Sequence, residues 1–169
     1  MSNSRISAPV GPASVSRIRV RYAETDQMGV VYHAHYFVWF EIGRVELLRH
    51  LGFSYREMEG DDGCHLPVAE AVCRFKSPAR YDEELALETR ILAAGGSLLK
   101  FGYRLVREGK PGDGQAQEVL AEAQTTHVLV DRRMRRRSFP VRYAAAIRAF
   151  MEGEDRGEDR RGEDRKDRS

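Results

Sequence analysis

The chain has 169 residues, enough for one domain with a sizeable core; 32% of the residues are charged and the formal net charge is +2. This balance argues neither for nor against an anionic partner, and no apolar run approaches the length of a membrane span. The N-terminus lacks the apolar core of a signal peptide, and Cys64 and Cys73 lack metal-ligand spacing. These features predict reduced thiols and a cytoplasmic location.

Three segments differ in composition. Residues 1–14 are small and polar and contain Pro9 and Pro12, which predicts a flexible leader. Residues 15–151 carry the apolar patterns of a folded domain. Residues 152–169 repeat Glu-Asp-Arg with glycine and no large apolar side chain, so we expect a disordered charged tail.

The first patterned segment, residues 16–22, alternates apolar side chains with arginines. This period of two predicts a half-exposed strand. The side chains expected on its buried face are Ile18, Val20 and Tyr22.

A long helix is predicted next, over residues 32–51, with a length of about 30 Å. Residues 36–40 are all apolar, and a helix that is apolar all round is expected to be buried. Glu41 and Arg44 lie three positions apart and are expected to pair with each other. Gly52 is well placed to end the helix in a left-handed conformation.

After a short helical turn and loop at residues 53–63, the pattern changes to that of strands. The alternating strands need one buried face and the apolar helix needs cover on most sides. We therefore predict an α+β fold in which an antiparallel sheet wraps around one long central helix. The predicted strands are residues 66–75, 83–94, 98–108 and 118–131, with turns at 95–97 and 109–114 and a last helix at 141–151.

The turn before the long helix contains one acid, Asp26, and then Gly29, where the backbone can turn without a side-chain clash. The helix start presents free N–H groups and the positive end of the helix dipole. A carboxylate facing such donors suits attack on a carbonyl, because the donors hold the oxyanion while the acid activates water or attacks directly. On spacing alone, a simple turn role for Asp26 is favoured.

A longer motif around Asp26 favours the catalytic role over the simple turn role. The run from Asp26 through Gly29 and Tyr32 to Tyr36 resembles the signature of hotdog-fold acyl-CoA thioesterases. The similarity is to the 4-hydroxybenzoyl-CoA thioesterase-like group, which includes enzymes associated with the Tol-Pal cluster. Further similarity lies in residues 78–82 and 130–140, so the resemblance covers roughly residues 15–151.

The resemblance implies hydrolysis of an acyl-CoA thioester, or of an acyl carrier protein thioester, to the free acid and the thiol. It implies that Asp26 is the catalytic carboxylate and that backbone N–H groups near Val31 and Tyr32 form the oxyanion hole. It also implies a homodimer with one continuous sheet, often paired into a homotetramer, with active sites at the dimer interface. Coenzyme A enters only as part of the substrate, and no metal or redox cofactor is implied. A general-base role and a nucleophilic role for Asp26 both remain open.

Two first-turn side chains, Tyr32 and His33, are further catalytic candidates. His33 could donate a hydrogen bond to the thioester oxygen or help to protonate the leaving thiolate, and packing at the dimer seam is an equal alternative. Packing is favoured for Tyr32. His33 and His35 point about 200° apart on a helix, so they cannot chelate a metal together.

The densest basic run, residues 132–137, could hold the phosphates of coenzyme A, since arginine suits phosphate oxygens. A solvated turn is the alternative. A nucleic-acid site is not expected, because it would need aromatics between the basic residues and only Phe139 is near. The candidate phosphate ligands are Arg133, Arg135 and Arg136, with Lys76 and Arg80 as competitors.

A function from another class is also compatible with these patterns. A non-catalytic hotdog module could bind acyl-CoA or a protein partner through the arginine-rich segment. The acid at position 26 in an otherwise intact motif favours the enzyme.

Overall fold

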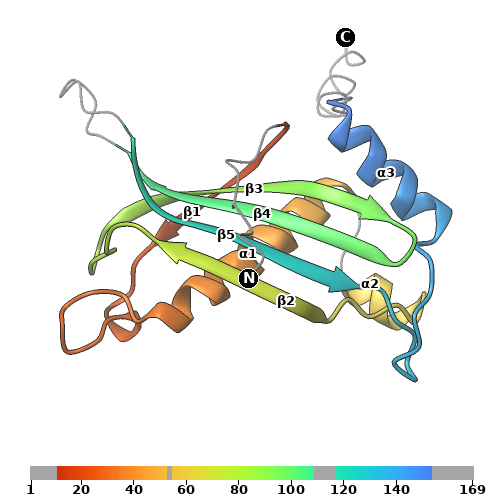
Figure 1. Ribbon diagram of the computed structural model, residues 1–169, viewed down its shortest axis with the longest axis horizontal. Coiled ribbons are helices and arrows are strands. Elements are labelled where there is room, and N and C mark those ends of the chain that lie inside the picture. The colour runs from red at the N-terminus through yellow and green to blue at the C-terminus, as the bar shows by residue number, and fades with distance from the viewer. Residues whose placement is uncertain (1–10, 53–54, 109–116, 154–169) are drawn as a thin grey trace, which may run out of the picture.

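The structure is a computed structural model that describes residues 11–52, 55–108 and 117–153 (Figure 1). None of the helices in these ranges is long and apolar enough to cross a bilayer. The predicted turn at 109–114, residues 1–10 of the predicted leader and residues 154–169 of the predicted tail lie outside the described residues. The elements in chain order are β1 (Ser14–Arg19), the 3₁₀ turn η1 (Tyr22–Glu24), α1 (His33–His50), α2 (Tyr55–Gly60), β2 (Val68–Phe75), β3 (Glu84–Gly95), β4 (Leu98–Arg107), β5 (Glu118–Val128) and α3 (Val141–Met151).

The five strands form one antiparallel sheet in the order β1-β3-β4-β5-β2, with β1 and β2 at its edges. Figure 1 shows the curved sheet with α1 running across one face. The predicted hairpin between β3 and β4 is confirmed, with Gly95 opposite Leu98 and Gly96 at φ +57°. The prediction of a sheet wrapped around one long helix is confirmed.

Helix α1 lies directly on β3. A Cβ at Gly43 would stand 2.4 Å from Thr89 Oγ1 and 2.8 Å from a methyl of Leu87, so only glycine permits this close approach. The helix ends as predicted: Gly52 has φ +85° and donates its N–H to the carbonyl of Arg49. The buried residues of α1 are Tyr36, Trp39, Phe40, Gly43, Arg44, Leu47 and Leu48.

The expectation that the first turns of α1, residues 36–40, are buried on all sides is wrong for the single chain. The sheet covers one side of the helix, while Phe37, Val38 and Ile42 on the other side are 36%, 45% and 41% exposed. Edge strand β2 is exposed on both faces, including Val68 and Phe75. The described part of the chain therefore leaves apolar surface uncovered on both α1 and β2.

Two local predictions are also wrong. Strand β1 ends at Arg19, and Tyr22 lies in the following 3₁₀ turn with 78% of its surface exposed, because Glu24 closes that turn by accepting the N–H of Arg21. Arg44 does not pair with Glu41. It turns into the core and donates from Nε to the hydroxyl of Tyr55 over 2.6 Å.

Candidate active site

The segment before α1 is a tight hairpin. The Asp26 N–H donates to the carbonyl of Val30, and the Gly29 N–H donates back to the carbonyl of Asp26, each over 2.9 Å. Gly29 has φ +71°, which a side chain would disfavour. A bridge between Thr25 and Val31 closes the hairpin. The backbone on both sides of Asp26 is therefore fixed by hydrogen bonds.

The Asp26 side chain is half-buried and takes part in this turn. Its Oδ1 accepts the N–H of Met28 over 2.8 Å, so the turn role that its spacing suggests is confirmed. Its Oδ2 has no hydrogen-bond partner within the described ranges. The turn thus holds the carboxylate in one orientation and leaves one oxygen available for chemistry.

The backbone donors differ from those expected. The Val31 N–H donates to the carbonyl of Ala79, and the Tyr32 N–H donates to the carbonyl of Glu24, each over 2.9 Å. Both groups that the sequence predicts for the oxyanion hole are therefore already engaged, because the hairpin and the loop before β3 anchor the helix start. The next two N–H groups, those of His33 and Ala34 in the first turn of α1, find no acceptor in the described chain.

The side chains of Tyr32 and His33 are exposed beside this helix end, with ring centroids 4.4 Å apart. Tyr32 also meets His35 edge to face at 6.4 Å. In the three described segments, no three His, Cys, Asp or Glu side chains are placed to hold a metal ion.

A buried carboxylate that the sequence analysis did not single out, Glu24, stabilises the segment before the hairpin. Glu24 is 2% exposed; its Oε1 accepts Trp39 Nε1–H over 3.0 Å and Arg21 Nη2–H over 2.8 Å. Its Oε2 accepts the Arg21 N–H over 2.8 Å. Burial disfavours the charged form, but the hydrogen bonds from Arg21 and Trp39 outweigh it, so the pKa of Glu24 is lowered. Through these hydrogen bonds, Glu24 links Arg21, which follows β1, to Trp39 of α1.

The basic candidates are divided between two places. Arg80 lies beside the hairpin, with Nη1 3.4 Å from the carbonyl oxygen of Gly29. Lys76 is paired with Glu122 over 2.7 Å.

The arginine-rich segment forms a second hairpin. Asp131 Oδ1 accepts the N–H groups of Arg133 and Arg135, and its Oδ2 pairs with the Arg135 side chain over 2.8 Å. The side chains of Arg133 and Arg136 are exposed. Figure 1 shows this hairpin, between β5 and α3, at the opposite end of the long axis from the hairpin that precedes α1. Within one chain, therefore, these arginines do not reach Asp26.

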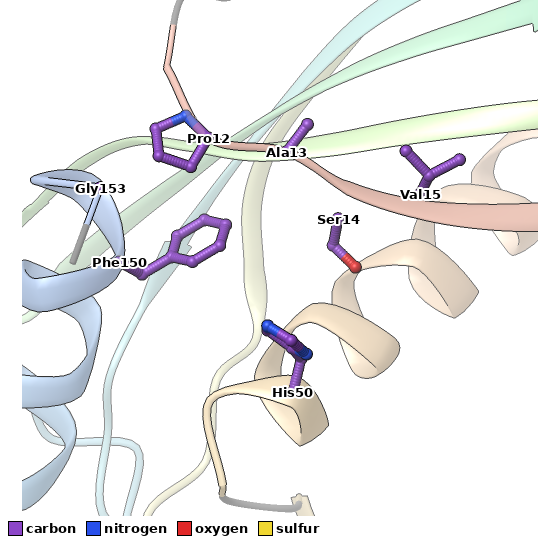
Figure 2. Close-up of a pocket in the computed structure, with 7 residues that line it drawn as sticks. All are labelled: Pro12, Ala13, Ser14, Val15, His50, Phe150 and Gly153. Carbon is purple, nitrogen blue, oxygen red and sulfur yellow. The ribbon is translucent and has the colours of Figure 1, made fainter. Parts of the chain in front are cut away.

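One pocket lies away from the candidate active site at Asp26. A hollow of about 390 Å³ lies between the start of β1 and the C-terminal ends of α1 and α3, where His50 and Phe150 converge (Figure 2). It lies at the end of α1 remote from Asp26.

Comparison with known proteins identifies the family. The family model described as the thioesterase-like superfamily matches residues 20–150. The chain belongs to this superfamily. Its described residues have the fold of this group, which confirms the predicted hotdog architecture.

Thioesterase-like relatives align over most of their length. YneP of Bacillus subtilis, assigned provisionally as an acyl-CoA thioesterase, is 40% identical over 119 residues, 70% of this chain and 80% of YneP. The acyl-CoA thioester hydrolase YbgC of Escherichia coli O6:H1 is 33% identical over 132 residues, 78% of this chain and 92% of YbgC. These matches confirm the prediction of a thioesterase-family enzyme; the association with a Tol-Pal cluster stays a prediction.

Solved structures give the same fold. A hypothetical protein from Thermus thermophilus superposes with a TM-score of 0.72 at 38% identity, covering 81% of this chain and 98% of that one. A 4-hydroxybenzoyl-CoA thioesterase superposes equally well, with a TM-score of 0.72 at 18% identity, covering 80% of this chain and 98% of that one. At that identity, the second match supports the fold alone.

Proposed function

We propose that this protein hydrolyses the thioester bond of an acyl-CoA and releases the free acid and coenzyme A. The observation that carries the proposal is the Asp26 carboxylate, held on a hydrogen-bonded hairpin that leads into α1. One of its oxygens and the first two N–H groups of α1 have no hydrogen-bond partner among the residues that the structure describes. The relationship to YbgC and YneP supports the choice of acyl-CoA as substrate.

The chemistry follows from these groups. The N–H groups of His33 and Ala34 bind the thioester oxygen and stabilise its negative charge in the tetrahedral state. On the general-base route, the Asp26 carboxylate takes a proton from water, whose oxygen attacks the carbonyl carbon; the C–S bond then breaks, and the thiolate takes up a proton from Asp26 or from His33. On the nucleophilic route, Asp26 attacks the carbonyl carbon and the C–S bond breaks as the anhydride forms; the thiolate takes up a proton from His33 or from water, and a second water then hydrolyses the anhydride and frees Asp26.

A homodimer joined through β2 completes the proposal, because it brings the two hairpins together. The start of β2 lies beside the arginine hairpin, through the bridges that Val130 makes with His65 and Arg136. The end of β2 lies beside the N-terminal turns of α1, where Phe75 packs on Tyr36 at 4.9 Å. Antiparallel pairing of β2 with its copy places the start of one strand beside the end of the other. The arginines of one subunit then lie near the acid of its partner.

The exposed apolar side of α1 gives a test of this dimer. Replacing Val38 and Ile42 by Lys together adds four charges to a symmetric interface, which costs several kcal/mol of desolvation. We expect light scattering after gel filtration to show monomers, and we expect loss of thioesterase activity. Val15, 55% exposed on the opposite edge strand β1, is the matched control, since Val15→Lys should leave a dimer. A fully active monomer would exclude the shared site.

The direct test of function is release of free thiol from purified wild-type protein with short, long and aromatic acyl-CoA esters. Turnover of at least one ester supports the thioesterase. Binding of coenzyme A esters without release would support the non-catalytic hotdog module. Release only from acyl carrier protein thioesters would move the substrate to that class.

The role of Glu24 in holding the hairpin that carries Asp26 can be tested by substitution. In Glu24→Gln, an amide NH₂ must face either the Arg21 N–H or the Trp39 Nε1–H, so one hydrogen bond to a buried group is lost and the hairpin loosens. We expect kcat to fall by about tenfold and the free energy of unfolding to fall by about 1–3 kcal/mol, with KM little changed.

The control for this variant is Glu46→Gln, which breaks an exposed ion pair with Arg49. It should leave both kcat and the melting temperature unchanged. A Glu24→Gln protein that is destabilised but turns over at the wild-type rate would show that Glu24 supports only the fold.

A further inference from the structure

A groove of about 650 Å³ lies between α1, α2 and the segment that leads into β2. It opens beside the start of edge strand β2, where Val68 lines it, and beside the arginine hairpin, where Met134 lines it. The other residues along its walls are Glu41, Arg44, Val45, Arg49, Tyr55, Arg56, Glu59, His65, Leu66 and Pro67.

One wall residue, Arg44, carries a buried charge that pairs with no carboxylate of the described residues. The residue is 8% exposed, and in the described residues its guanidinium forms no ion pair with a carboxylate. Its Nε donates to the Tyr55 hydroxyl over 2.6 Å, and its Nη1 is 3.5 Å from His127 Nε2. A buried cation is costly unless it is paired, so an anionic ligand in contact with this guanidinium would be stabilised more than one at an exposed arginine.

The neighbours of Arg44 remain neutral. His127 is fully buried, with Nδ1 3.1 Å from the Leu66 carbonyl oxygen and Nε2 2.9 Å from Thr125 Oγ1. Burial, and then the charge of Arg44, lower the pKa of His127 to about 4. Burial raises the pKa of Tyr103 to about 12. The described neighbours accept hydrogen bonds from Arg44, but none of them carries a negative charge at neutral pH.

Other charges along the groove are exposed to solvent. The carboxylates of Glu41 and Glu59 would repel an anion held at the rim, while Arg56 would attract one. Water and salt screen these exposed charges far more than a contact at a buried guanidinium. The balance therefore favours an anion only in direct contact with Arg44.

We propose that, in the β2-paired dimer, the groove of one subunit lies near Asp26 of its partner and binds the far end of the acyl group, and that this end is a carboxylate, held by Arg44. The inference rests on the proposed thioesterase function. The planar guanidinium matches a carboxylate, and the apolar parts of Val45, Leu66 and Pro67 suit the methylene chain between the carboxylate and the thioester. The phosphates of coenzyme A are the other source of anions and form a separate arm of the test.

The test compares ω-carboxyacyl-CoA esters with fatty acyl-CoA esters of equal length, from five to fourteen carbons. At the length that reaches Arg44, the carboxy ester should have a kcat/KM about ten- to a hundredfold higher in wild type. Arg44→Gln should abolish this preference. Arg90→Gln, which breaks the Glu88 ion pair on the other face of the sheet, should retain it. Equal or lower kcat/KM for the carboxy ester at every length would overturn the inference while leaving the thioesterase intact.

A measurement of ligand binding tests the anion site even if the Arg44→Gln variant does not fold or no ester is hydrolysed. Adipate should raise the melting temperature of wild type, while the neutral adipamide should not, because only a ligand that binds the folded state stabilises it. If no ester is hydrolysed, the proposed function fails and the adipate result alone decides the anion site. Stabilisation by inorganic phosphate but not by adipate would assign the site to coenzyme A phosphates and overturn the inference.

Discussion

Replacing Asp26 by Asn is expected to lower kcat by roughly 10²–10⁴-fold, the range that a positioned acid or base contributes. The amide oxygen can still accept the Met28 N–H at 2.8 Å, so the turn and the hairpin should persist. The change therefore removes the charge and the basicity of the carboxylate while leaving the site in place. Thiol release under saturating substrate measures the loss, and KM should change little because the group acts in the transition state.

The matched control is Asp82→Asn. Asp82 is also a turn acid but is exposed, with φ +65°, a conformation that asparagine also tolerates. Its replacement should leave kcat unchanged, and both variants should bind coenzyme A as wild type does. Wild-type turnover by Asp26→Asn would assign the chemistry to another residue.

Replacing His33 by Pro is expected to lower kcat by roughly 10²–10³-fold, because it removes one backbone donor from the oxyanion hole. The fold should tolerate the change. Proline is favoured at the first position of a helix, and this N–H has no acceptor in the described chain. Tyr32 before it has φ −61° and ψ 132°, which a following proline requires.

The control, His33→Ala, removes the imidazole and keeps the N–H. If the backbone donor matters, His33→Ala should retain most of the activity that His33→Pro loses. Equal losses in both variants would instead support a role for the His33 side chain, in binding the oxygen or protonating the thiolate. Wild-type activity in His33→Pro, with unchanged melting temperature, would exclude the His33 N–H as a donor.

The sequence predicts the elements whose signals are local. Helix α1 lies within one residue of its expected ends, because an apolar run and a glycine that can take φ +85° define it. Helix α3 has the bounds expected from the proline before it. The β3–β4 hairpin follows from its Gly-Gly-Ser turn. Each of these elements depends on neighbours a few residues away.

The supporting contacts of the site depend on distant residues, and the sequence does not reveal them. Glu24 is recognisable only after α1 brings Trp39 to it from fifteen positions away. An acid at the end of an amphipathic strand is the single hint. The N–H groups of Val31 and Tyr32 look free at a helix start, but Ala79 and Glu24 accept them.

Charge patterns are the least informative part of the sequence. Glu41 and Arg44 have ideal helical spacing, yet Arg44 turns inward to Tyr55. The arginine run suggests a phosphate clamp, but its distance from Asp26 within the chain depends on the tertiary fold (Figure 1). The dimer proposed above would bring the two together, and its contacts lie between copies of the chain, where sequence spacing carries no signal.

The most direct test of the account is a crystal structure of Asp26→Asn with a bound acyl-CoA that the wild-type protein hydrolyses. We expect the thioester oxygen within hydrogen-bonding distance of the His33 and Ala34 N–H groups, with the side chain at position 26 facing the carbonyl carbon. A thioester bound elsewhere, with these two N–H groups bonded to protein or solvent alone, would contradict the proposed site.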